Sequence, residues 1–459
     1  MKKILLLTLC LISTAFTGFG QTNGLAEFAK TKYGLFVHYV WAGKYGHLTV
    51  DRNGKPPATM EAMANDFDVQ GFANDVSAWG VEYVIFTAWH ANINPLFPSE
   101  TMKKWGMADH TCKRDLIGEI IAALKAKGIK VILYTHPRDG HDLRGDERIN
   151  TSWGLGKSKN PANSWDPDWD QFDYKKWNDF NNELYCELMN RYGKDIFGLY
   201  LDEGSPMGDS YRVVDYPRLR QTIKSKCPHL VMIQNYYGNL YSCDVGDKEY
   251  AHWQEFANRD GGAWPGYQMP VGSVFAANWW AEKPVGTNTV TFTPEDMFRY
   301  TVLQAGVNTE GGGVAWAAGP YTGGGWETGV DETMRKVASY INPVATSIKG
   351  VYASKAFPTA KGAALKSIGW GVRAVEWGVA TDAADGSATY IHVLNPPEGK
   401  TLHIGMPTNS VRFESAKLLA NGEPVSLTFD AAGYVIILPQ DRDWDKLDTV
   451  IRLQVGKNK

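Results

Sequence analysis

Short apolar runs alternate with helical patterns along the first two thirds of the chain. Runs that are apolar at every position predict parallel strands covered on both faces. Seven or eight such strand–helix units over about 300 residues favour a closed (β/α)8 barrel over an open sheet. A dinucleotide-binding sheet is less well supported, since no G-x-G-x-x-G follows the first run. The strand candidates are Gly34–Tyr39, Tyr83–Ala88, Lys130–Tyr134, Ile196–Leu201, Leu230–Ile233, Ser273–Ala277 and Gly312–Trp316. The helix candidates are Val69–Trp79, Lys113–Lys127, Phe172–Tyr192, Asp215–Lys226 and Pro294–Ala305.

The pattern changes after about Gly350, where short and partly alternating runs are separated by turn residues. This is typical of a small antiparallel β-sandwich. The sequence therefore predicts a barrel over residues 21–348 and a C-terminal β-sandwich over residues 349–459. The strand candidates in the second part are Ala374–Val379, Ala388–Leu394, Val411–Leu419, Val435–Leu438 and Thr449–Val455.

The first 20 residues have the pattern of a secretory signal. Two lysines precede an apolar run from Ile4 to Phe16, and small residues stand just before Gln21. This arrangement predicts cleavage near Gln21 and a bacterial periplasmic or secreted location. No later segment approaches the roughly 20 apolar residues of a membrane span.

Charge and cysteine content exclude some classes of partner and cofactor. A formal net charge of -3 over 459 residues provides no basic excess, which argues against nucleic acid and anionic membranes as partners. The cysteines after the signal are widely scattered and form no C-x-x-C, so the sequence predicts neither a metal site nor any other cofactor. One disulfide and buried free thiols both remain open for Cys112, Cys186, Cys227 and Cys243.

Imidazoles, aromatic rings and carboxylates stand where the apolar runs end. In barrel enzymes the site is built from the C-terminal ends of the strands. Flat aromatic faces among polar groups suit sugar rings, and two carboxylates are the minimum equipment for glycosidic cleavage. Asp202 can serve as one of them, although a strand-end acid can instead cap a loop or pair with an arginine. A metal-dependent hydrolase that uses His136, His141 and Asp142 is an alternative.

Several segments resemble glycoside hydrolase family 29, the alpha-L-fucosidases. Lys32–His38 (KYGLFVH) is similar to the family's opening strand KFGIFIHWG, and Glu82–His90 to its KYVVLTTKHHDGF. Lys113–Glu119 resembles RDLVGELV, and Phe197–Asp202 falls where the family has DxLWFDG. Gly311–Pro320 is similar to GGNLLLNVGP, and all these segments occur in the family's order.

The resemblance implies a retaining exo-glycosidase in which Asp202 is the nucleophile. The second carboxyl group, about 5 to 5.5 Å away in such enzymes, protonates the leaving group. The family's Asp-to-Glu spacing favours Glu249, reached from Asp244, while Glu255 lies among aromatic neighbours that could raise its pKa. Strand ends and family analogy together give the predicted substrate-binding residues His38, Trp89, His90, Tyr134, His136, Asn235 and Trp316.

Three departures from the family pattern leave the sugar open. Ala91 replaces the second histidine of HHDGF, Glu203 follows the nucleophile in place of glycine, and Gln234–Tyr236 (QNY) replaces NDR. We therefore expect a glycan or glycoconjugate substrate with a terminal α-L-fucosyl or related sugar. A glycosidase for a different sugar and a non-catalytic carbohydrate-binding descendant remain alternatives, and the oligomeric state is not indicated.

Overall fold

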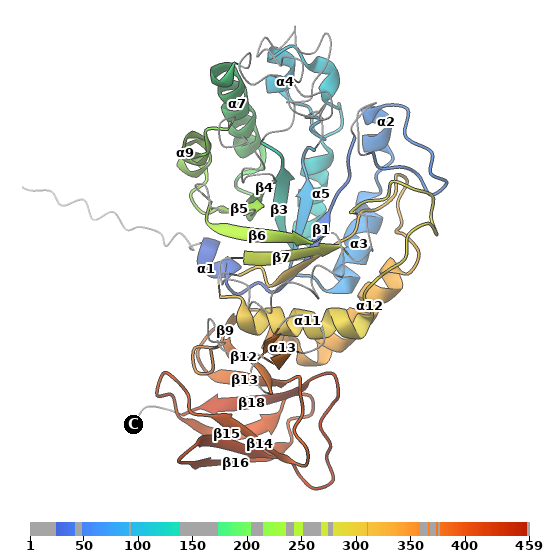
Figure 1. Ribbon diagram of the computed structural model, residues 1–459. Coiled ribbons are helices and arrows are strands. Elements are labelled where there is room, and N and C mark those ends of the chain that lie inside the picture. The colour runs from blue at the N-terminus through green and yellow to red at the C-terminus, as the bar shows by residue number, and fades with distance from the viewer. Residues whose placement is uncertain are drawn as a thin grey trace, which may run out of the picture.

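Eight parallel strands form a closed barrel in the computed structural model (Figure 1). The structure describes residues 24–41, 48–90, 93–137, 173–202, 214–235, 243–250, 268–273, 279–309, 311–358, 366–367, 373–374 and 377–456; for 248–250, 268–273, 366–367 and 373–374 the account is limited to the backbone. Strand β8 pairs with β1 in parallel and closes the barrel, as the sequence predicts. The strands are β1 (Tyr33–Val37), β2 (Tyr83–Thr87), β3 (Lys130–Thr135), β4 (Gly198–Leu201), β5 (Val231–Asn235), β6 (Val245–Tyr250), β7 (Gln268–Ser273) and β8 (Val314–Ala317).

Two barrel strands differ from the sequence prediction. Strand β6 has the sequence VGDKEY, which contains no apolar run, and it was not expected. Strand β7 ends at Ser273, where the predicted strand begins. The apolar-run rule applies to strands that are apolar on both faces. It therefore misses a barrel strand that carries charged residues between β5 and β7.

Helices surround the barrel, and several begin at an aspartate. The carboxylates of Asp68, Asp115, Asp173 and Asp215 each accept a hydrogen bond from the backbone amide three residues later, at 2.9–3.1 Å. Such N-caps satisfy amides that have no partner within the helix. The helices are α1 (Gly24–Phe28), α2 (Met60–Asn65), α3 (Val69–Trp79), α4 (Glu100–Lys104), α5 (Leu116–Ala126), α7 (Tyr174–Tyr192), α9 (Tyr216–Lys226), α11 (Pro294–Val307), α12 (Val330–Ile341) and α13 (Ala345–Ile348).

The barrel interior is filled by side chains on alternate strand positions. Neighbouring residues of a strand face opposite sides, so Ile132 and Tyr134 of β3 point inward while Leu133 packs against the helices. Ala315 and Ala317 are the inward residues of β8. This parity determines which strand-end residues can reach the mouth of the barrel.

An antiparallel sheet follows the barrel and curls around its own core, forming the predicted β-sandwich. Its spatial order is β14-β17-β16-β15-β18-β13-β12-β9, and Ile391, Ile436 and Leu453 meet in the core. The strands are β9 (Val351–Ala353), β12 (Gly378–Ala383), β13 (Ala388–Val393), β14 (Thr401–Gly405), β15 (Phe413–Leu418), β16 (Pro424–Asp430), β17 (Gly433–Ile437) and β18 (Thr449–Val455), and β10 (Lys366–Ser367) pairs with β11 (Arg373–Ala374) separately.

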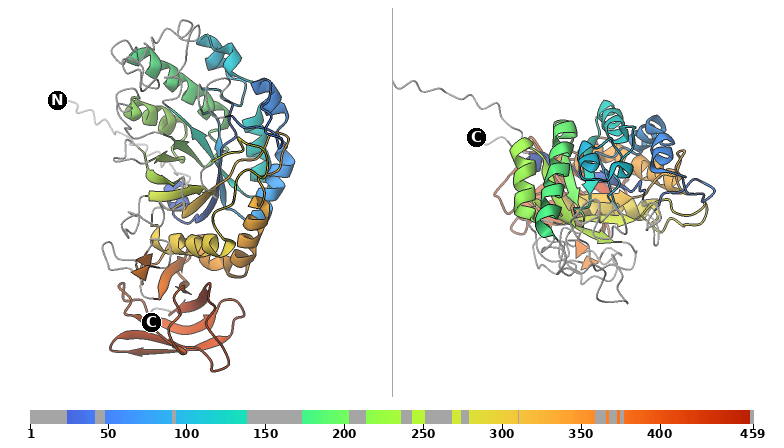
Figure 2. Two further views of the ribbon diagram at one scale, coloured as in Figure 1. Left: turned by 45° about the vertical axis from the view of Figure 1, so that its right-hand side comes forward. Right: turned by 90° about the horizontal axis from the view of Figure 1, so that it is seen from above.

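Helix α11 lies between the barrel and the sandwich (Figures 1 and 2). Arg299 on this helix donates to the carbonyl oxygens of Lys446 at 2.9 Å and Leu394 at 3.0 Å. Val379 and Tyr390 of the sandwich belong to the same apolar cluster as the helices around the barrel. The two parts therefore share a continuous core.

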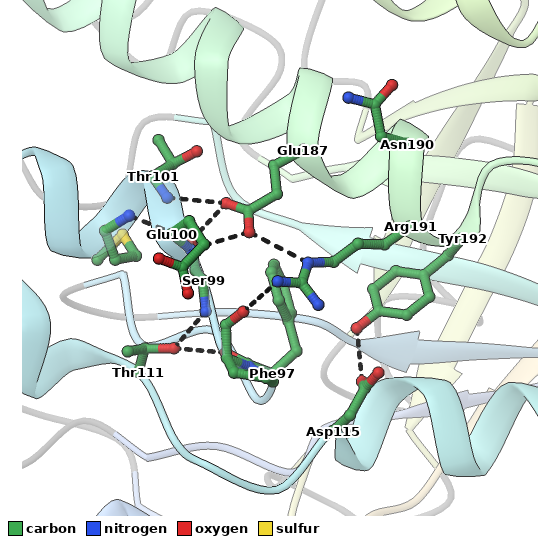
Figure 3. A network of polar contacts seen from close by, with 12 residues as sticks. Phe97, Ser99, Glu100, Thr101, Thr111, Asp115, Glu187, Asn190, Arg191 and Tyr192 are labelled. Atoms are coloured by element: carbon green, nitrogen blue, oxygen red, sulfur yellow. Dashed lines mark hydrogen bonds and ion pairs between the residues drawn. The ribbon is translucent and has the colours of Figure 1, made fainter.

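The connection after β2 is attached to α7 by the carboxylate of Glu187 (Figure 3). This carboxylate accepts from the Ser99 hydroxyl at 2.7 Å, the Thr101 amide at 3.0 Å and the Arg191 Nε at 3.1 Å. Burial alone would raise the pKa of Glu187, but the hydrogen bonds from Ser99 and the α4 amides hold it below its usual value.

Among the described helices, none has the length and apolar content that crossing a bilayer requires.

Candidate active site

Asp202 follows the last residue of β4 and accepts hydrogen bonds on both carboxylate oxygens. The Tyr134 hydroxyl on β3 donates to Oδ2, and Nδ2 of Asn235 on β5 donates to Oδ1 at 2.6 Å. The Asp202 amide donates to the Thr135 carbonyl oxygen at 2.9 Å, which continues the pairing between β3 and β4. Hydrogen bonds to a carboxylate stabilise its negative charge and restrict its orientation. Three adjacent strands thus fix one carboxylate at the C-terminal end of the barrel.

His38, one residue beyond β1, lies at the centre of a group of rings around this carboxylate. Its ring centroid is 4.7 Å from that of Tyr134, 5.1 Å from His90 and 5.0 Å from Trp280, each in an edge-to-face arrangement. His38 Nδ1 is 3.0 Å from the Thr87 hydroxyl oxygen, and that hydroxyl donates to the Val37 carbonyl. With the Thr87 hydrogen directed to the Val37 carbonyl, His38 Nδ1 is the donor to the Thr87 oxygen, which corresponds to the tautomer protonated at Nδ1.

His90 and His136 extend the same group of rings. The His90 ring stacks on Tyr134 at 5.4 Å with an interplanar angle of 23°, and its centroid is 5.4 Å from that of His136. His136 is 4% exposed and Asn235 is fully buried. The structure thus brings five of the predicted substrate-binding residues together with Asp202, namely His38, His90, Tyr134, His136 and Asn235.

Trp89 and Trp316, the other two predicted substrate-binding residues, do not join this group of rings. Trp89 is 1% exposed, packs edge-to-face on Tyr185 of α7 at 5.2 Å, and donates to the His136 carbonyl oxygen. Trp316 is fully buried and donates to the Thr301 hydroxyl of α11 at 3.2 Å. Strand parity explains the Trp316 placement, because Ala315 and Ala317 occupy the inward positions on either side of it.

The two candidates for the second carboxyl group remain predictions. Glu249 occupies a backbone position on β6, and its side chain lies outside the described residues. The same holds for the whole of Glu255 and for Glu203, which follows Asp202. His141 and Asp142, two ligands of the alternative metal site, are also outside the described part of the chain. Within the part that is described, no three His, Cys, Asp or Glu side chains gather to hold a metal ion.

Three residues near the site were not predicted as members of it. Trp280 contributes a ring to the His38 group and donates its indole N–H to Glu282 Oε2 at 3.0 Å. Tyr200 donates its hydroxyl to Asp247 Oδ2 at 2.7 Å, and Asp247 is fully buried. The adjacent tryptophans at 279 and 280 were a usable signal, whereas Asp247 lies in the strand that the sequence did not reveal.

The sequence profile of the alpha-L-fucosidase family matches residues 21–264, which is more than half of the chain. The chain belongs to the alpha-L-fucosidase family. This membership confirms the resemblance to glycoside hydrolase family 29 that the strand segments carry. The matched residues 21–264 include the segments around His38, His90 and Asp202.

Two curated relatives are similar to part of the chain. One is a Caenorhabditis elegans protein named as an alpha-L-fucosidase. It is 30% identical to this chain over 198 residues, which are 34% of this chain and 40% of the relative. The tissue alpha-L-fucosidase of Rattus norvegicus is 27% identical over 130 residues, or 23% of this chain and 28% of the rat protein. Each match therefore spans less than half of the relative's length.

Solved structures of alpha-L-fucosidases share the fold over nearly the whole chain. A family 29 enzyme from Bacteroides thetaiotaomicron has a TM-score of 0.65 at 18% identity, covering 95% of this chain and 96% of its own. Isoenzyme 1 from Paenibacillus thiaminolyticus has a TM-score of 0.65 at 19% identity, covering 95% of this chain and 100% of its own. The Thermotoga maritima enzyme has a TM-score of 0.60 at 16% identity, covering 94% of this chain and 96% of its own. At these identities the likeness concerns the fold.

Proposed function

We propose that this protein is a retaining glycoside hydrolase that removes terminal α-L-fucosyl or closely related sugars from glycans. The observation that carries the proposal is the environment of Asp202. Its carboxylate lies at the C-terminal end of the barrel, with donors on both oxygens and the His38, His90 and Trp280 rings close by. A barrel enzyme that cleaves a glycosidic bond needs such a fixed carboxylate beside a surface that accepts a sugar ring.

In the proposed reaction Asp202 attacks the anomeric carbon and the leaving oxygen departs. A second carboxyl group, Glu249 or Glu255, donates a proton to that oxygen and later removes one from the incoming water. The Tyr134 and Asn235 donors hold the carboxylate still, which lowers the entropy cost of reaching the reactive geometry. The B. thetaiotaomicron relative was captured as a covalent intermediate with 2-fluoro-fucosyl fluoride, which supports double displacement in this family.

The rings around Asp202 suit a sugar with both an apolar and a polar face. Trp280 offers an indole beside two imidazoles, and imidazole nitrogens are suited to hydrogen bonds with hydroxyl groups. Ala91 and Tyr236 replace a histidine and an arginine of the family pattern, so the hydroxyl-binding set differs from that pattern. The proposed substrates therefore include α-L-fucosides and sugars of related shape.

The test is hydrolysis of aryl α-L-fucoside and a panel of other aryl glycosides by the wild type and by Asp202→Asn. We expect the wild type to accept at least one substrate and the variant to lose its turnover. A variant that matches the wild-type rate would contradict the nucleophile assignment. A wild type that binds glycans, releases no sugar from any of them, and binds equally well after Asp202→Asn would support a non-catalytic binding protein instead.

The second carboxyl group can be assigned with Glu249→Ala and Glu255→Ala. Loss of the acid/base residue of a retaining enzyme leaves the intermediate open to attack by a small anion, because such an anion needs no general base. Added azide should therefore restore turnover in one variant and yield the glycosyl azide. Loss of wild-type activity on chelation, with no azide effect in either variant, would favour the alternative metal-dependent hydrolase.

We also propose that the protein is exported to the bacterial periplasm or medium. The support is the lysine pair and apolar run of residues 1–20, which have the composition of a signal peptide. Expression of the full chain in a bacterial host, followed by fractionation and N-terminal sequencing, tests this. We expect an exported product that begins near Gln21, and an uncleaved product confined to the cytoplasm would contradict the proposal.

A further inference from the structure

Asp247 is a buried carboxyl group inside the barrel, close to the site and distinct from the two acid/base candidates. Asp247 is fully buried on β6, and in the sheet it is paired with Asn235, the donor to Asp202 Oδ1. The Tyr200 hydroxyl of β4 donates to Asp247 Oδ2 at 2.7 Å. A buried carboxyl group is costly unless it is hydrogen-bonded, so this contact ties the end of the Tyr200 side chain to β6.

Tyr200 is stacked on the tyrosine that contacts the proposed nucleophile. The Tyr200 and Tyr134 ring centroids are 5.4 Å apart, with an interplanar angle of 20°. Phe36 packs edge-to-face against both, at 5.6 Å from Tyr134 and 5.3 Å from Tyr200. The Tyr134 hydroxyl in turn donates to Asp202 Oδ2. A continuous series of contacts therefore leads from Asp247 through two stacked rings to Asp202.

We propose that Asp247 and Tyr200 are positioning residues for the proposed nucleophile. The tilt of a tyrosine ring is only loosely set by its own rotamer, because the torsion to an aromatic ring has a broad energy minimum. The hydrogen bond to Asp247 fixes the tilt of Tyr200, and stacking transmits this orientation to Tyr134. The Tyr134 hydroxyl is thereby held where it donates to Asp202. This inference rests on the proposed function of Asp202.

A matched control lies in the same barrel. Tyr83 of β2 is also fully buried and points inward, and its hydroxyl donates to the Gly312 carbonyl oxygen at 2.6 Å. Removing this hydroxyl breaks a buried hydrogen bond of the same kind, yet its acceptor is a backbone carbonyl near the start of β8. Tyr83→Phe therefore separates a general loss of stability from an effect that passes through Tyr134.

The first test is a double-mutant cycle with kcat and KM measured on an aryl glycoside that the wild type accepts. We expect Tyr200→Phe to lower kcat by about tenfold with little change in KM, since a small misplacement of a catalytic group reduces the rate of the chemical step. In the Tyr134→Phe background, Tyr200→Phe should have no further effect, because the contact it acts through is already absent. Fold-changes that multiply in the double variant would overturn the proposal.

Substitutions of Asp247 and Tyr83 are measured in the same kinetic assay as the cycle. Asp247→Asn keeps an oxygen that can accept from Tyr200, so it should retain more of kcat than Asp247→Ala. Tyr83→Phe should leave kcat within about twofold of the wild type, although it removes a buried hydrogen bond. A Tyr83→Phe loss of kcat equal to that of Tyr200→Phe would assign the effect to stability alone.

The second test does not depend on activity. Crystal structures of the wild type and Tyr200→Phe would show whether the Tyr134 hydroxyl keeps its contact with Asp202. We expect a tilted Tyr134 ring and a lost hydrogen bond in the variant, and an unchanged contact would overturn the proposal. A wild type that hydrolyses no glycoside would contradict the proposed function, while this comparison would still decide the positioning role.

Discussion

The two ends of the barrel each hold a carboxylate in a different way. At the N-terminal end, Glu82 precedes β2 and accepts from the backbone amides of Lys32 at 2.8 Å, Tyr33 at 3.1 Å and Gly350 at 3.3 Å. At the C-terminal end, Asp202 accepts from two side chains, those of Tyr134 and Asn235. The Glu82 partners are backbone amides, whereas the Asp202 partners are side chains at the site.

This difference separates a structural carboxylate from the proposed nucleophile. Amides from β1 and from the junction with the sandwich converge on Glu82, so it joins segments far apart in the sequence. Burial raises its pKa, and the hydrogen bond from the Lys32 amide, followed by the charges of Lys130 and Lys349, partly offsets that effect. Asp202 joins neighbouring strands that already pair with each other, and its side-chain contacts instead set the direction of its oxygens. The comparison predicts opposite effects on stability and activity when each carboxylate is removed.

The largest expected effect is on activity at the C-terminal end. Asp202→Asn should lower kcat by at least about 1,000-fold, because the amide cannot act as the nucleophile. The unfolding midpoint in urea should change little, since the amide oxygen can still accept from Asn235 and the Tyr134 hydroxyl can turn to accept from the amide nitrogen. Circular dichroism and steady-state kinetics on the same sample check both expectations. A variant that loses activity only because it is unfolded would weaken the comparison.

At the N-terminal end we expect the reverse. Glu82→Ala leaves buried amides without their acceptor and should lower the free energy of unfolding by about 2–3 kcal/mol. The kcat of the folded fraction should stay close to that of the wild type. Glu27→Ala is a suitable control, because its carboxylate pairs with Lys30 at a partly exposed position. Equal stability of the two variants would contradict the structural role of Glu82.

Lys32, at this end of the barrel, makes the stability of the protein depend on pH. It is fully buried, its Nζ donates to the Asn308 carbonyl oxygen at 2.9 Å, and burial lowers its pKa from 10.5 to about 7. Above about pH 7 the unfolded chain binds a proton here that the folded chain does not. Lys32 should therefore make stability rise with pH, by up to about 1.4 kcal/mol per unit. Burial raises the pKa of Cys112, Cys227 and Cys243, so above about pH 8.5 the unfolded chain loses thiol protons that the folded chain keeps, and this opposes the rise.

Urea titrations of the wild type between about pH 7 and pH 8 measure that rise, below the ordinary cysteine pKa of about 8.5. Lys32→Met retains an unbranched apolar side chain without the charge, so its stability should be flatter over the same range. A wild type and variant with parallel pH profiles would show that Lys32 does not titrate in this window.

The smallest effect is expected at a third carboxylate, outside the barrel. Glu187 accepts from both backbone and side-chain donors and fastens α4 to α7 (Figure 3). Glu187→Gln should lower the free energy of unfolding by about 1–2 kcal/mol, because the amide nitrogen faces donors. Its kcat should match the wild type. A loss of kcat without a loss of stability would mean that this outer network also positions the site.

The sequence predicted the parts of the molecule that depend on regular patterns. Apolar runs located β1 to β5 and β8, and the rule that barrel sites lie at strand ends located Asp202, His38 and His90. The parity of each strand could not be obtained this way. A run that is apolar on both faces does not reveal which residues face inward, and for this reason the outward position of Trp316 was not foreseen. Trp89 lies two residues beyond β2, where strand alternation no longer applies, and it packs on Tyr185 of α7.

The Asp247 contact was beyond the reach of pattern analysis for a different reason. Strand β6 carries the charged residue Asp247 inside the barrel, where a hydrogen bond from Tyr200 offsets the cost of burying it. Such a strand can be recognised only when its partners on β4 and β5 are known. The stacking of Tyr134 on Tyr200 likewise joins side chains of adjacent strands that are far apart in the sequence.

The most direct test of the account is chemical capture of the nucleophile. The wild type would be incubated with 2-fluoro-α-L-fucosyl fluoride, digested and analysed by mass spectrometry. We predict one covalently bound fluorosugar, on the peptide that contains Asp202, and no label on Asp202→Asn. A label on another residue, or turnover of α-L-fucosides that proceeds with inversion at the anomeric carbon and leaves no label, would contradict the account.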